Sequence, residues 1–245
     1  MSVDKINYQV CLSPDLLHLF DLKGKVVIVV DILRATSCMV TAFAHGIDSI
    51  IPVAKLDECR SLQKQGYKAA AERDGSKVEG FDLDNSPFSY MNPHLKGVTI
   101  AVTTTNGTQA IEKSKDAKLI LVGAFLNISS IATQIKIFND DVVVVCAGWK
   151  GNVNLEDTLF AGALASILDD AISIKQDAAI LAKNLFEQHK SNLLEIVKAS
   201  EHAKRLINLN IIKDIEFCLT FDLYSSVPIL SDNQLKEISL INQLI

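Results

Sequence analysis

The 245-residue chain is 49% hydrophobic and 22% charged, a composition that supports the core of one large domain or of two smaller ones. Its 29 Asp and Glu residues outnumber its 24 Lys and Arg residues, and the formal net charge is −5. Because no Lys- or Arg-rich run is present, we expect no general binding to nucleic acid. An anionic ligand would need positive charge gathered at its own site.

The cysteines and the apolar runs give an expectation about the compartment. Five cysteines are scattered along the chain without a CxxC pair, so neither a disulfide framework nor a zinc site is indicated. No targeting segment is visible, and the apolar runs are far shorter than the roughly 20 residues that a membrane helix needs. We therefore expect a reduced, cytoplasmic protein that does not enter a membrane.

Residues 26–30, VVIVV, predict the first buried strand, because a half-exposed strand would alternate apolar with polar residues. Asp31 and Arg34 follow it directly, ahead of a helix expected over residues 37–44. A turn acid and a solvated cation would be the simple interpretation, but it does not explain charges that abut five buried aliphatic residues. We therefore predict catalytic roles for Asp31 and Arg34.

Residues 47–53 and 69–71 predict two further strands, and the second of them ends at Glu72 and Arg73. Arg73 would add a cation that can bind an anionic substrate. A turn-rich segment without hydrophobic periodicity comes next. It carries two acids that either hold a metal ion or close local turns, Asp82 and Asp84.

The strand predicted at residues 98–102 leads into a loop rich in threonine, ahead of a helix over 109–114. Hydroxyls, an amide and a glycine at a helix N-terminus suit an anion, because they offer uncharged donors, close backbone approach and the positive end of the helix dipole. A helix cap alone would need only one of these residues. We predict that the loop binds substrate through Thr104, Thr105, Asn106, Gly107 and Thr108.

Another strand is predicted at residues 119–122, with a helix through residue 135 after it. Asn127 lies between the two. It either contacts the ligand or caps the helix, and the sequence leaves both interpretations open.

The run at residues 142–146, VVVVC, predicts an interior parallel strand. It is followed by a loop in which Trp149 and Lys150 lie between Gly148 and Gly151. Glycine allows a sharp turn or close approach to a ligand, but neither needs a bulky ring and a charge. We therefore predict that Gly148 and Trp149 bind substrate and that Lys150 takes part in catalysis.

A helix over about residues 155–168 should follow that loop, with Asn154 as its cap. Its first turn holds Glu156 and Asp157. Acids are favoured there by the helix dipole alone, yet they follow the carboxyl end of a buried strand, where α/β proteins bind ligands.

The remaining segments predict a covering layer and a last strand. Residues 176–210 and 214–220 have helical patterns, and residues 227–230 suggest a strand. The alternation of strands and helices predicts an α/β fold with a mostly parallel or mixed sheet and helices on both faces. It forms either one compact unit or two α/β lobes, over residues 1–95 and 96–245.

Four strand ends thus carry polar residues, and parallel strands connected by right-handed crossovers would place these ends on one rim. Arginine and lysine match phosphate, sulfonate and carboxylate oxygens, while a few carboxylates hold Mg²⁺. Phosphoryl transfer needs little beyond positioning and charge neutralisation. No P-loop and no GxGxxG motif is present, which disfavours kinases and dinucleotide-binding enzymes.

Taken together, the motifs resemble the 2-phosphosulfolactate phosphatase family. The similarity runs in order from about Val26 to Pro228 and rests on the following stretches: Asp31-Ile-Leu-Arg-Ala-Thr36, Glu79-Gly-Phe-Asp82 with Asn85-Ser-Pro87, Thr103-Thr-Thr-Asn-Gly-Thr108, Cys146-Ala-Gly-Trp-Lys-Gly151, Leu155-Glu-Asp-Thr158 and Ile215-Glu-Phe-Cys218.

The resemblance implies Mg²⁺-dependent hydrolysis of (2R)-2-phospho-3-sulfolactate to 3-sulfolactate and phosphate, a step associated with coenzyme M biosynthesis. We expect Asp31, with Glu156 or Asp157, to hold Mg²⁺. The threonine loop and Lys150 would stabilise the charge of the transition state.

Three nucleophiles stay open: a metal-bound water, Asp31 as a phosphorylated carboxylate, and Cys146 as a thiolate. Two other functions are alternatives, namely a phosphatase for another small phosphorylated hydroxy acid and a non-catalytic anion-binding module. A homodimer is one option for the assembly.

Overall fold

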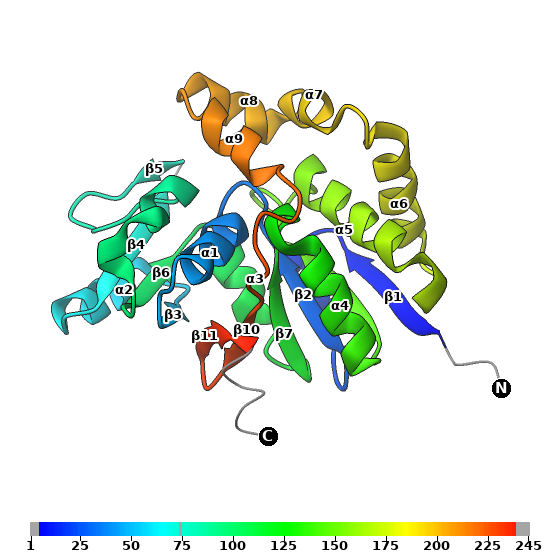
Figure 1. Cartoon of the computed structure of the whole chain (residues 1–245), viewed down its shortest axis with the longest axis horizontal. Helices are drawn as coiled ribbons and strands as arrows, with labels where there is room; N and C mark the ends of the chain where they lie inside the picture. Colours follow the sequence, from blue (N-terminus) through cyan, green and yellow to red (C-terminus); the bar gives the residue numbers. More distant parts are fainter. Residues whose placement is uncertain (1–4, 74, 239–245) are drawn as a thin grey trace.

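The computed structural model of the protein describes residues 5–73 and 75–238. Within these ranges, eleven strands form one sheet in the order β5-β4-β6-β3-β11-β10-β7-β2-β8-β1-β9 (Figure 1). The strands are β1 (Ile6–Cys11), β2 (Val26–Val30), β3 (Ser49–Pro52), β4 (Lys68–Arg73), β5 (Ser76–Lys77), β6 (Thr99–Thr103), β7 (Leu119–Gly123), β8 (Val142–Cys146), β9 (Ile172–Ile174), β10 (Pro228–Ser231) and β11 (Gln234–Glu237).

The sheet consists of two parallel groups connected by a hairpin. Strands β4, β6 and β3 are parallel to one another, as are β7, β2, β8, β1 and β9. The β10–β11 hairpin lies between the groups and pairs antiparallel with β7 and with β3. The predicted α/β fold with a mixed sheet is therefore confirmed.

Helices cover both faces of this sheet (Figure 1). They are α1 (Ala35–Ala44), α2 (Leu56–Lys64), α3 (Gly107–Lys113), α4 (Ile128–Phe138), α5 (Leu155–Leu168), α6 (Asp177–His189), α7 (Leu193–Lys198), α8 (Glu201–Asn208) and α9 (Ile212–Cys218). None of the helices in the described ranges has the length and hydrophobicity that crossing a membrane requires.

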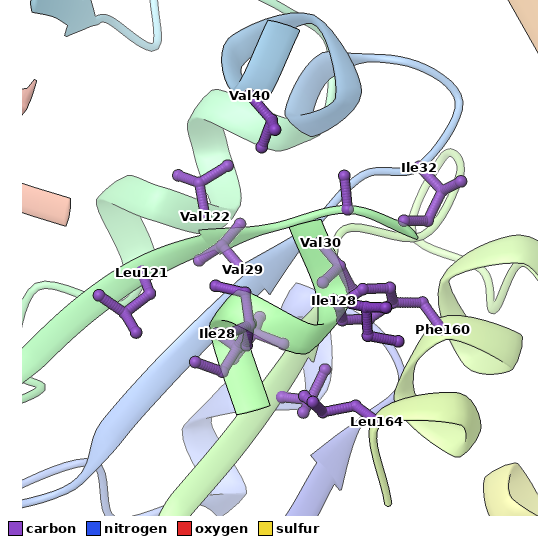
Figure 2. Packing of buried hydrophobic residues seen from close by; sticks show 14 of the residues in the cluster. Ile28, Val29, Val30, Ile32, Val40, Leu121, Val122, Ile128, Phe160 and Leu164 are labelled. Carbon is purple, nitrogen blue, oxygen red and sulfur yellow. The ribbon is translucent and has the colours of Figure 1, made fainter. Parts of the chain in front are cut away.

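The centre of the core is built on β2 and β8, whose residues are all buried. Figure 2 shows Val40 of α1 on one side of β2 and β7, and Phe160 and Leu164 of α5 on the other. Burying a valine or leucine side chain contributes about 1.5–3 kcal/mol. The unbroken apolar runs are therefore explained by helices on both faces, and they fix the strand ends from which the polar loops leave.

Several expected boundaries are confirmed, and some elements were missed. Strands β2 and β8 and helix α5 have the expected bounds. Strands β1, β5, β9 and β11 were not expected, because β5, β9 and β11 are only two, three and four residues long and none of them is fully buried. Strand β1 alternates buried with half-buried residues over most of its length, the weaker pattern of a strand near the edge of a sheet.

The two predicted lobes contribute strands that mix within the sheet. Strand β6, from residues 96–245, lies between β4 and β3, and β8 lies between β2 and β1. The boundary between residues 95 and 96 therefore does not coincide with a break in the sheet.

Candidate functional site

Loops from four strand ends, together with helix α8, surround one cleft. Hydrogen bonds link the loops to one another: Arg34 Nη2 donates to the Gly75 carbonyl (2.9 Å) at the cleft, and Arg73 Nη2 donates to Thr103 Oγ1 (3.2 Å) between the ends of β4 and β6. The cleft is lined by Asp31, Leu33, Arg34, Glu72, Gly75, Asn85, Thr105, Asn106, Trp149, Lys150, His202, Arg205 and Leu206. The structure thus brings together side chains that are up to 175 residues apart in the sequence (31 to 206).

Asp31 is the carboxylate at the centre of this arrangement. It follows β2 and is 6% exposed, and helix α3 approaches it so closely that a Cβ on Gly107 would lie 2.9 Å from its Oδ2. Burial raises the pKa of Asp31 to about 6, against the opposing effect of His202, and Glu72 and Glu156 raise it further. Three buried carboxylates, those of Asp31, Glu72 and Glu156, therefore lie close enough to influence one another.

Asp157 is tied to the backbone of two loops. Its Oδ1 accepts from the Ile32 N–H (2.8 Å) and its Oδ2 from the Gly148 N–H (3.1 Å). Burial raises its pKa well above the usual value, as do the nearby carboxylates of Asp31 and Glu156. With both oxygens engaged, Asp157 joins the loops after β2 and β8.

Glu156 is completely buried and has one oxygen without a partner. Its Oε1 accepts from Asn154 Nδ2 (3.1 Å) and bonds to His202 Nδ1 (2.7 Å). Within residues 5–73 and 75–238, Oε2 has no hydrogen-bond partner. A favourable helix dipole does not explain a fully buried acid, and Asn154, the residue preceding α5, uses its amide for Glu156 instead of capping the helix.

Arg34 is held in a buried ion pair. Its Nη1 lies 2.6 Å from Asp214 Oδ2 on α9, and both side chains are at most 10% exposed. The pair attaches α9 to the loop after β2. Arg34 also lines the cleft, so its guanidinium combines a structural contact with a position at the candidate site.

The end of β4 carries two charged side chains that make separate contacts. Glu72 is buried and accepts from the Gly75 N–H and from Thr105 Oγ1 (3.4 Å). Arg73 bonds to the Glu72 carbonyl (2.6 Å) and to Thr103, and it is absent from the residues that line the cleft. Its predicted role in substrate binding stays a prediction.

The threonine loop divides into two parts. The Thr104 and Thr108 hydroxyls each accept from the backbone N–H of the other residue at 3.2 Å, so they close the turn before α3. Thr105 and Asn106 line the cleft. Two polar side chains of this motif therefore stabilise the loop, and two others face the space in which a ligand would bind.

The loop after β8 is a tight turn that presents Trp149. Trp149 and Asn152 exchange two backbone hydrogen bonds of 2.9 and 3.0 Å, while Lys150 and Gly151 have positive φ of 52° and 78°. Gly148 has φ 62°, and a Cβ there would lie 2.4 Å from the Asn152 carbonyl oxygen. Glycine is therefore required at position 148 both by conformation and by space.

We expect Gly148→Ala to destabilise the fold by roughly 2–4 kcal/mol, because positive φ costs about 1–3 kcal/mol and the clash adds to it. Gly24→Ala is the matched control, since Gly24 has φ 77° with nothing within 4 Å of an added Cβ. Chemical denaturation of both variants measures the difference. Equal losses would show that the turn relaxes around the new methyl group.

Asn127 and Cys146 are two further predicted site residues that do not line the cleft. Asn127 is buried and bonds to the Ala124 N–H (2.9 Å) and the Ser226 carbonyl (2.8 Å), contacts that favour a structural role. Cys146 is fully buried in β8, and burial raises the pKa of its thiol well above the usual value. A thiolate nucleophile at Cys146 is therefore disfavoured.

The acids of the turn-rich segment make local contacts. Asp82 bonds to Lys68 and to the Ala69 N–H, and Asp84 accepts from the Ser86 N–H. Within the described ranges, no cluster of three or more metal-binding side chains is present. The turn interpretation therefore describes Asp82 and Asp84.

Sequence reasoning missed His202 and Arg205, both on α8, and Asp214 on α9. The only available signal was the spacing of three residues between His202 and Arg205, which places them on one helix face. This spacing is too common to indicate a site.

The fold and the cleft define an α/β protein with a charged cleft at the carboxyl ends of its strands, where buried carboxylates lie beside arginines and a lysine. Comparison with known proteins shows to which family of α/β proteins the chain belongs. The sequence profile described as 2-phosphosulpholactate phosphatase matches residues 11–233, and the chain belongs to this family.

Curated relatives extend over nearly the whole chain. A probable 2-phosphosulfolactate phosphatase of Thermotoga petrophila is 43% identical over 203 residues, covering 83% of this chain and 88% of the relative. One from Caldanaerobacter subterraneus subsp. tengcongensis is 41% identical over 213 residues (85% and 88%). One from Clostridium tetani is 34% identical over 227 residues (91% and 97%).

Proposed function

We propose that this protein hydrolyses (2R)-2-phospho-3-sulfolactate to 3-sulfolactate and phosphate. The observation that carries the proposal is the cleft itself, which is lined by Arg34, Lys150 and Arg205 together with the buried carboxylate Asp31. A substrate with phosphate, sulfonate and carboxylate groups needs several cations in an acidic protein. Family membership supplies the reaction, and the relatives' names give the same substrate.

Mg²⁺ is part of the proposal, with Asp31 and Glu156 as its protein ligands. The structure supports this choice through the partnerless Glu156 Oε2, which is buried close enough to Asp31 to raise its pKa. Mg²⁺ in phosphoryl-transfer sites uses one or two carboxylates together with waters and substrate oxygens. Asp157, the third predicted ligand, is less suited because backbone N–H groups occupy both of its oxygens.

A bound Mg²⁺ would neutralise phosphate charge and lower the pKa of a water nucleophile. The chain's own residues would position the ester. Thr105 and Asn106 face the cleft as uncharged groups, and Lys150 lies on the exposed turn where it can reach a phosphate oxygen. We prefer water over Asp31 as the nucleophile, because Leu33 stands where aspartyl-phosphate phosphatases have a second acid.

The compartment and assembly are part of the same proposal. We propose a cytoplasmic enzyme, since the five scattered cysteines suggest no disulfide framework. A homodimer is proposed as the assembly.

Phosphate release from 2-phosphosulfolactate and from a panel of phosphorylated three-carbon acids, with Mg²⁺ and with EDTA, tests the function. We expect release from the sulfonated substrate that stops in EDTA and returns when Mg²⁺ is added. Release from a different acid would replace the substrate and keep the reaction. No release from any compound would leave an anion-binding module as the function.

A further inference from the structure

Helix α8 places a second guanidinium in the cleft, that of Arg205. A Cβ on Gly75 would lie 3.6 Å from Arg205 Cζ, and the Gly75 carbonyl accepts from Arg34. The guanidinium groups of Arg34 and Arg205 therefore both lie close to Gly75. Asp214 offsets the charge of Arg34, whereas Arg205 forms no salt bridge with a carboxylate in the described ranges, and its Nε there is buried without a partner.

A chain of contacts fixes the orientation of Arg205. Its Nη2 lies 3.3 Å from His202 Nε2, and His202 Nδ1 lies 2.7 Å from Glu156 Oε1. A guanidinium can only donate, so His202 Nε2 accepts and the ring proton on Nδ1 is donated to Glu156. This fixes the tautomer of His202 and connects a carboxylate, an imidazole and a guanidinium.

Trp149 contacts both His202 and Arg205 and helps to hold them in place. Its ring stacks on His202 with centroids 5.5 Å apart and an angle of 8°, and Arg205 Cζ lies 5.4 Å from its centroid. Cation–π contact of this kind holds a guanidinium without using its hydrogen-bond donors. The donors of Arg205 that remain can therefore point into the cleft.

We propose that Arg205 is an anion-binding residue of this site, which donates hydrogen bonds to two oxygens of the phosphate, and that Glu156, His202 and Trp149 position it. The inference rests on the proposed function, because a phosphate ester brings the anion. It adds a residue from α8 to the cations offered by the strand-end loops. A planar fork with donors free is suited to two phosphate oxygens, which a lysine ammonium cannot match.

Binding of inorganic phosphate, measured by isothermal titration calorimetry, tests the inference without turnover. We expect Arg205→Ala to weaken phosphate binding about 10- to 100-fold, as for the loss of hydrogen bonds to a charged group, and Arg205→Lys to recover only part. Lys204→Ala is the matched control, because it removes an exposed cation from the neighbouring position. Its affinity should equal that of the wild type.

His202→Asn tests the positioning. The asparagine Nδ2 can keep the bond to Glu156, but the shorter side chain has no acceptor atom at the position of Nε2, so we expect weaker phosphate binding. In the Arg205→Ala background the same change should have no further effect. Additive losses would overturn the positioning role.

The outcomes also separate this inference from the proposed function. Phosphate binding that depends on Arg205 in a chain that hydrolyses none of the phosphorylated acids would support the inference and overturn the function. A KM raised by Arg205→Ala with kcat retained would support both. Equal phosphate binding by the wild type, Lys204→Ala and Arg205→Ala would overturn the inference, as would a wild type that binds no phosphate.

Discussion

Asp31→Asn should lower kcat/KM roughly 100- to 1,000-fold, the usual cost of removing one group that stabilises charge in the transition state. The amide keeps the size of the side chain and removes the negative charge at the end of β2, where the proposed cation would be held. Phosphate release with saturating Mg²⁺ measures the effect. Asp116→Asn is the control, because Asp116 is exposed and its loss changes the net charge equally.

The same variant should be more stable than the wild type at high pH. The pKa of Asp31 is about 6 in the folded chain, compared with 3.8 as its ordinary value, so the folded state binds the proton more tightly. The contribution of Asp31 to the free energy of unfolding is therefore greatest below about pH 4. It falls as the pH rises toward and through 6. This difference in the pKa of Asp31 lowers the free energy of unfolding of the wild type by on the order of 3 kcal/mol at pH 8.

Melting temperatures of Asp31→Asn and the wild type, both in EDTA, should thus diverge between about pH 4 and pH 7, with the variant melting higher. A constant difference across that range would contradict the buried and ionised Asp31. A higher melting temperature of Asp31→Asn, together with its loss of activity, would show that the charge of Asp31 is kept for function at the expense of stability.

The second large effect is expected at Arg34. Arg34→Ala should destabilise the fold by about 3–5 kcal/mol, because it leaves Asp214 buried without its partner. Urea denaturation measures this loss. Lys68→Ala is a suitable comparison, since it breaks an exposed ion pair with Asp82 at a similar distance of 2.7 Å and should cost 0–1 kcal/mol.

The double variant Arg34→Ala/Asp214→Ala should lose less than the sum of the two single variants, because neither charge is then left alone. Losses that simply add would mean that the contact between α9 and the loop after β2 is maintained by packing. In that case the guanidinium of Arg34 would be free for the substrate.

Much of the candidate site could be predicted from the sequence, since each signal was local. The apolar runs of β2 and β8 predicted interior strands, and polar residues placed directly after such strands lie at their carboxyl ends. Asp31, Arg34, Thr105, Asn106, Trp149 and Lys150 were identified in this way, and all line the cleft. The expected rim assumed one parallel sheet, whereas the hairpin β10–β11 separates two parallel groups.

Local signals could not separate residues that face the ligand from those that build the loops. Thr104 and Thr108 belong to the same motif as Thr105, yet their hydroxyls close a turn. Asp157 stands beside Glu156 in the sequence, but its oxygens are taken by backbone groups of two loops. Which atom meets which partner depends on the packing of distant segments.

By itself, then, the sequence determined the α/β class, the buried strands and the loops that hold the chemistry, because hydrophobic period and glycine positions act over a few residues. The tertiary structure alone decided the partners of those loops. Asp214 meets Arg34 across 180 positions, and His202 meets Glu156 across 46. Such contacts follow from how α8 and α9 pack over the strand ends, and no local spacing records that packing.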